Sequence, residues 1–128
     1  MTGISTENVI KCVLAESALR YMEGEGRPSL LTYDNRKALE EIIATATEEL
    51  YARYGTILKI EYAGDIIKIE SLVPTDEGRL RAAIECYLKF RVMSIAYGGG
   101  EYESAENEAL DRVGMIPVKG QCCVRSSW

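Results

Sequence analysis

The sequence predicts a mostly α-helical (α+β) fold: a four-helix core with an inserted two-stranded β-hairpin and an extended C-terminal tail. Apolar residues recur at spacings of three and four through most of the chain, and the spacing changes to two at about residues 56–73. Glycine or proline residues separate these segments. A length of 128 residues, with 47% hydrophobic and 27% charged residues, fits a single folded domain, residues 1–128.

Two helices are predicted before the hairpin. The first covers about residues 6–23 and begins at Ser5 or Thr6, either of which can cap it through its hydroxyl. The second covers about residues 35–54, with Asp34 as its N-cap. Each helix has an apolar stripe on one side, so each is expected to pack against the core.

The hairpin has apolar residues on both faces. Alternating positions predict two strands with one apolar face, while Ile57 and Ile66 add apolar surface on the other face. A lone two-stranded hairpin is marginally stable in water. We therefore expect another subunit to cover this sheet, and a charged residue at Ile60 or Ile69 to impair assembly more than folding.

Two further helices are predicted after the hairpin. The third, at about residues 76–97, follows Pro74 and is apolar over a wide arc, which indicates a central helix with neighbours on several sides. Three glycines break it, and the fourth helix covers about residues 101–113 and ends at Gly114. The tail, residues 115–128, either adds a strand to a neighbour's sheet or is disordered.

Composition argues against several classes of function. The chain has no histidine, which removes the commonest general base and the usual zinc ligand. The four cysteines are too few and too scattered for a disulfide-stapled secreted scaffold, which favours reduced thiols in the cytosol, and their lack of C-x-x-C spacing argues against a zinc site. We predict no catalytic residue, no cofactor and no metal ligand; an enzyme using tyrosines and carboxylates would need a deep pocket. A net charge of −5 disfavours binding to nucleic acids and anionic membranes.

Candidate interface residues lie on the hairpin, among the tyrosines and in the tail. The chain has eight tyrosines but one Phe and one Trp, and tyrosine suits partly hydrated interfaces. The tyrosines fit the edge of a core equally well. The predicted interface residues are Ile57, Leu58, Ile60, Tyr62, Ile67, Ile69, Tyr97, Tyr102, Val118, Val124 and Trp128.

The order of these elements resembles a known family. A capped helix pair is followed by a short β-arm, by Pro74-Thr75-Asp76-Glu77, and by a helix that contains the stretch Leu80 to Arg91, a glycine break and another helix. Over most of residues 7–113 this arrangement is similar to the head-to-tail connector (adaptor) proteins of tailed bacteriophages.

The resemblance implies a structural virion protein and not an enzyme. About a dozen copies would form a ring that joins the portal to the tail, contacting portal and tail proteins while DNA passes through without specific binding. The protein would fold in the host cytoplasm and reside in the virion. The alternative is a small intracellular regulatory or inhibitory protein that acts as a dimer and sequesters a partner or a ligand. Sequence alone does not predict copy number, partner identity, host or the role of Cys122 and Cys123.

Overall fold

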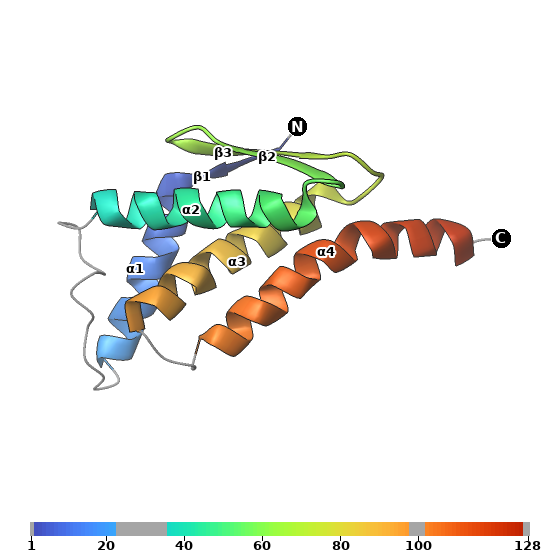
Figure 1. Cartoon of the computed structure of the whole chain (residues 1–128). Helices are drawn as coiled ribbons and strands as arrows, with labels where there is room; N and C mark the ends of the chain where they lie inside the picture. Colours follow the sequence, from blue (N-terminus) through green and yellow to red (C-terminus); the bar gives the residue numbers. More distant parts are fainter. Residues whose placement is uncertain (1, 23–35, 98–101, 127–128) are drawn as a thin grey trace.

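Four helices and a small antiparallel sheet make up the computed structural model, which confirms the mostly α-helical (α+β) prediction (Figure 1). It describes the backbone of residues 2–22, 36–97 and 102–126, and the surroundings of the side chains of residues 3–19, 36–97 and 102–115. The elements are β1 (Thr2–Ser5), α1 (Thr6–Met22), α2 (Arg36–Tyr54), β2 (Leu58–Tyr62), β3 (Ile66–Ser71), α3 (Glu77–Tyr97) and α4 (Glu103–Ser126).

The sheet has three strands in the order β1-β3-β2, one more than predicted. The first strand pairs antiparallel with β3, with Ile4 opposite Ile67. The second pairs antiparallel with β3, with Ile60 opposite Ile69. Strand β1 has only four residues, and Ile4 is its one large apolar side chain. The sequence therefore has no alternating pattern that would indicate this strand.

The two faces of the sheet differ in polarity. Five inward-facing side chains are buried and belong to the core: Ile4, Leu58, Ile60, Ile67 and Ile69. The outer face is largely charged, with Lys59 opposite Glu70 and Glu61 opposite Lys68. This alternation is typical of an antiparallel sheet with one face on the core and one face in water.

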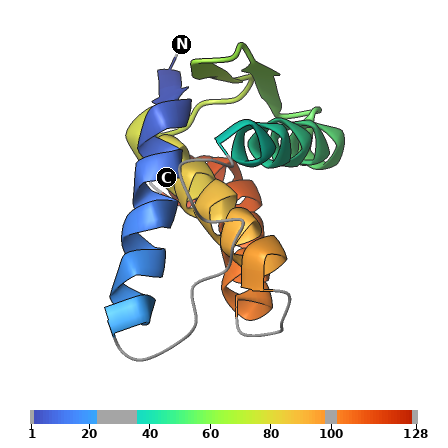
Figure 2. The same cartoon turned by 90° about the vertical axis from the view of Figure 1, so that its left-hand side faces the viewer.

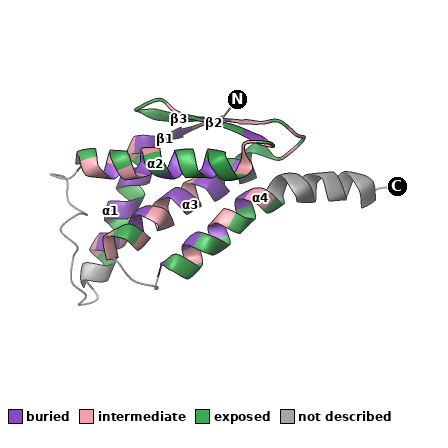
Figure 3. Cartoon of the chain, in the orientation of Figure 1, coloured by how far each residue is buried: buried purple, intermediate pink, exposed green. Residues whose placement is uncertain are grey.

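The chain's own helices cover the inner face of the sheet. Helix α2 packs along β2, and α1 and α3 contact β1. Helix α3 contacts α1, α2 and α4, so it is central, as its wide apolar arc predicted (Figure 2). Buried residues gather on the sides of α1, α2 and α3 that face one another (Figure 3). The hairpin is therefore part of the core and not a separate arm.

Short polar side chains fix the starts of two helices. The Asn8 amide donates to Ser5 Oγ at 3.3 Å, so Ser5 caps α1 as predicted. The Arg79 amide donates to Asp76 Oδ1 at 3.2 Å, so Asp76 caps α3. Thr6 Oγ1 donates to the carbonyl of Gly64 at 2.7 Å. That bond ties the start of α1 to the turn between β2 and β3.

The C-terminal region differs most from its prediction. Helix α4 was expected to end at Gly114 and to be followed by an extended tail, but it continues to Ser126. Gly114 lies inside the helix, where a Cβ atom would stand 2.6 Å from Tyr54 Cε1. The Tyr54 hydroxyl donates to the Leu110 carbonyl at 2.9 Å. A glycine is needed here because the Tyr54 ring approaches the helix backbone, so this glycine marks a close contact and not a helix end.

Three other predictions fall outside the described residues. They concern the connector after the first helix, the N-cap Asp34 and the glycine break at residues 98–100.

Candidate functional site: two grooves and the end of α4

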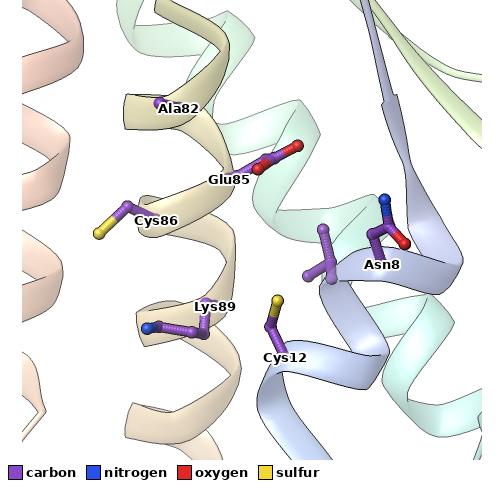
Figure 4. A pocket seen from close by; sticks show the side chains of 7 residues that line it. Asn8, Cys12, Ala82, Glu85, Cys86 and Lys89 are labelled. Atoms are coloured by element: carbon purple, nitrogen blue, oxygen red, sulfur yellow. The ribbon is translucent and has the colours of Figure 1, made fainter. Parts of the chain in front are cut away.

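The first groove lies between α1 and α3 and has a volume of about 220 Å³. Figure 4 shows it from close by. Apolar groups make up most of its surface, with an amide, a carboxylate, an ammonium group and two thiols around them. Its lining residues are Asn8, Val9, Cys12, Ala82, Glu85, Cys86 and Lys89.

The polar groups of this groove do not converge on one point. The Cys12 thiol points into the gap between the helices, and the Glu85 carboxylate leans from α3 toward α1 (Figure 4). The Cys86 thiol and the Lys89 ammonium group point away from α1, and Lys89 Nζ lies 4.6 Å from the centre of the Phe90 ring. The volume is also below the roughly 300–1,000 Å³ of typical small-molecule sites. Neither the volume nor the arrangement of polar groups is that of a typical metabolite site.

The second groove lies between α2 and α3 and has a volume of about 330 Å³. Small and aliphatic side chains form its floor, and two exposed carboxylates and one guanidinium group stand at its rim. Ile95 in this groove is 43% exposed although it is a large apolar residue. The lining residues are Ala38, Glu41, Ile42, Thr45, Ala46, Glu49, Arg91 and Ile95.

Arg91 links three helices at one end of the second groove. Its Nη2 lies 3.5 Å from Glu49 Oε2 on α2, and its Nη1 lies 3.0 Å from Glu106 Oε1 on α4. Glu106 is only 7% exposed, so its carboxylate depends on this partner. Burial opposes the charge of Arg91, but Glu106 and Glu49 outweigh it and raise the pKa of the guanidinium group. The ion pairs hold the first half of α4 against the body.

Tyr87 lies on α3 within reach of the same charges. The residue is 3% exposed. Burial raises the pKa of its phenol to about 12, and the nearby Glu49 carboxylate acts in the same direction. The phenol is uncharged at neutral pH, so it is a structural group and not a proton donor for chemistry near pH 7.

The predicted interface residues of the hairpin lie inside the molecule. Four of them are buried on the inner face of the sheet, so assigning them to an exposed interface was wrong. These four are Leu58, Ile60, Ile67 and Ile69. Ile57 and Tyr62 are half-buried and pack against the core. Strand β1 and the chain's own helices supply the cover that was expected from another subunit.

The predicted tyrosines join helices of the same chain. Tyr102 is buried, and its ring centre lies 5.4 Å from that of Tyr97 and 6.2 Å from that of Phe90. Tyr97 is half-buried, and its hydroxyl lies 3.4 Å from Ser17 Oγ. These contacts agree with the alternative of a core edge. Val118, Val124 and Trp128 lie outside the residues whose side chains the structure describes.

Sequence reasoning missed the groups that attach α4. These groups form two contacts through the packing of α2, α3 and α4: Arg91 with Glu106, and Tyr54 with the α4 backbone at Leu110 and Gly114. No spacing in the sequence indicates either contact. A signal did exist for the second groove. Ala38, Ile42, Thr45 and Glu49 follow one another at spacings of four, three and four, which places them on one side of α2.

Comparisons with known proteins return no relative. No family model, no curated protein and no solved structure matches the chain. Within the described part of the chain, no helix is both long and apolar enough to cross a membrane. Among the same residues, no group of three or more histidine, cysteine, aspartate or glutamate side chains is placed to hold a metal ion.

Proposed function

We propose that the chain is a structural protein that works as one subunit of an oligomer. The proposed role is that of a head-to-tail connector, a ring in the virion that joins the portal to the tail and through which DNA passes. One observation carries the proposal: α4 continues to Ser126, well past Gly114, where the Tyr54 ring lies against it. Figure 1 shows its last turns extending past the other helices and the sheet.

A helix end of this kind needs a partner. Isolated helices are marginal in water, and most helix stability in proteins comes from packing. The extension also contains Pro117, which has no amide hydrogen to donate, and Gly120. Inside a helix these residues cost about 3 and about 1 kcal/mol relative to alanine. Packing against another chain would offset these costs.

The order of elements supports the same role. A capped first helix, a second helix, the β2–β3 hairpin, a central helix and a final helix follow one another as in the family that the sequence resembles. The acidic balance of the chain, −5 overall, suits a channel wall that does not retain DNA.

Native mass spectrometry and negative-stain electron microscopy of the full chain test the proposal. We expect closed rings with a mass many times the 14.2 kDa of one chain. A stable dimer whose mass does not change when portal protein is added would favour the regulatory or inhibitory alternative. A monomer at every concentration tested would overturn both.

A further inference from the structure

The charge of the chain is divided unevenly along its length. All twenty acidic residues lie at or before Asp111, together with twelve of the fifteen basic residues. Residues 1–111 therefore carry a formal charge of −8, and residues 112–128 carry +3. The helix extension, residues 115–126, contains Lys119 and Arg125 and no acidic residue. A basic segment thus projects from an acidic body.

The groove between α2 and α3 combines an apolar lining with more acidic than basic groups. Its lining includes the small side chains of Ala38, Thr45 and Ala46, which allow another backbone to approach closely. A helix lying in the groove would cover Ile42 and the exposed Ile95. The lining holds two carboxylates and one guanidinium group: Glu49 is paired with Arg91 at 3.5 Å, and the carboxylate of Glu41 is exposed about two turns earlier on α2. Acidic groups at the rim of an apolar groove favour a partner that is both apolar and basic.

The groove runs along α2 from Ala38 to Glu49, and the end of it that holds Ala38 and Ile95 is the end farther from the α4 extension. Ala38 is in the first turn of α2 and Ile95 is in the last turn of α3. Figure 1 shows these helix ends on one side and the end of α4 on the other. The extension of a chain therefore points away from that chain's own groove. A contact between the two surfaces requires a second copy, and repeating it builds a head-to-tail series that can close into a ring.

We propose that the α4 extension, residues 115–126, of one copy docks in the α2–α3 groove of the next copy. This inference rests on the proposed assembly and specifies its contact surface. The apolar lining of the groove buries one side of the incoming helix, and Glu41 attracts the two basic residues of that helix, Lys119 and Arg125. Attraction between exposed charges is screened by salt, so assembly should weaken as ionic strength rises.

Charge reversal in the full-length chain tests the contact. Glu41→Lys reverses the groove rim, and Lys119→Glu with Arg125→Glu reverses the extension. Each variant alone should assemble about tenfold more weakly, which corresponds to reversing a partly exposed charge pair. A mixture of the two variants should assemble like the wild type, because each groove then meets an extension of opposite charge. Sedimentation velocity across a concentration series measures all three samples.

Two further variants make the result specific. Glu48→Lys makes the same charge change at an exposed position on α2 that does not line the groove, and it should leave assembly unchanged. Thr45→Trp fills the groove without changing charge and should weaken assembly at least as much as Glu41→Lys. Circular dichroism melting checks that each variant is folded.

The outcomes separate this inference from the proposed function. Wild-type oligomers that persist unchanged in folded Glu41→Lys and Thr45→Trp variants would overturn the docking site and leave the ring proposal standing. Two single variants that fail to assemble and do not recover on mixing would also overturn the docking site. A wild type that never assembles would overturn the proposed function itself.

Discussion

The sheet and helix α4 differ in whether the same chain covers their surface. The sequence pattern of the hairpin predicts that another subunit covers the sheet, yet its inner face is buried by α2 and by neighbouring elements of the same chain. The second half of α4 was expected to be an extended tail, yet it is a helix that leaves the body. Met115, at the point where it leaves, is 51% exposed.

The difference shows how a third strand changes the meaning of an apolar pattern. In the sequence pattern, Ile66 adds apolar surface to the second face of the hairpin. In the fold its side chain lies over β1, where a Cβ atom at Gly3 would stand 2.6 Å from Ile66 Cδ1. A glycine in β1 lets a neighbouring strand provide this cover. The sheet therefore gives no reason to expect a partner chain, and the proposed contact is placed on α4 instead.

The largest expected effect concerns the core of the sheet. Ile69 is 2% exposed, so Ile69→Asp places an unpaired carboxylate among Leu and Ile side chains. We expect it to lower the free energy of unfolding by about 4 kcal/mol or more, enough to unfold many domains. Urea unfolding followed by circular dichroism measures the change. Folding, and not assembly alone, should fail.

The matched control lies on the same strand but faces outward. Ile66 is 42% exposed, so Ile66→Asp should cost less than about 1 kcal/mol. A folded Ile69→Asp variant that has lost only its ability to assemble would return the subunit interface to the sheet.

An intermediate effect concerns the junction where α2, α3 and the first half of α4 meet. The folded-state pKa of Tyr87, about 12, lies above its ordinary value of 10. Its contribution to stability is therefore fully present below pH 10 and is lost as pH rises from 10 to 12, because the unfolded chain loses the phenol proton first. At 1.36 kcal/mol per pH unit, the loss reaches about 2–3 kcal/mol.

Tyr87→Phe isolates this contribution. In both proteins the free energy of unfolding is measured by urea unfolding at about pH 10 and about pH 12. The decrease between the two pH values should be about 2–3 kcal/mol smaller in the variant than in the wild type. Equal losses in the two proteins would mean that the phenol is not buried at this junction, and that the first half of α4 is held more loosely than the structure shows.

Periodicity predicted the parts of the fold that depend on neighbouring residues in the sequence. The first three helices begin and end within one or two residues of their predicted limits, since each has an apolar stripe and α1 and α3 have side-chain caps. The pairing of β2 with β3 followed from alternation around a glycine turn, and Gly64 there has φ +75°. Such signals are local, and a single sequence contains them.

Contacts between distant segments were not predictable in the same way. Nothing near Ile4 indicates that it will lie opposite Ile67, and nothing near Gly114 indicates that the ring of Tyr54 will lie against it. The second groove combines a stripe on α2, readable in the sequence, with Arg91 and Ile95 from α3, whose placement depends on helix packing. The errors on the hairpin interface, on the missing strand β1 and on the helix end arose at such contacts.

The smallest effect tests whether Gly114 is a helix end or a contact. If it only ended the helix, Gly114→Ala would raise stability by up to about 1 kcal/mol, as an alanine in a helix does. In the structure the added methyl group displaces the Tyr54 ring and its hydrogen bond to Leu110, so we expect a net loss of about 1–2 kcal/mol. Gly78→Ala is the control, because a Cβ atom there meets only Asp76 Oδ1, at 3.4 Å, and stability should not fall.

In a Tyr54→Ala background the obstacle is gone, so the same change at Gly114 should become stabilising in thermal unfolding. A loss of the same size in both backgrounds would show that Tyr54 does not hold α4 where it leaves the body.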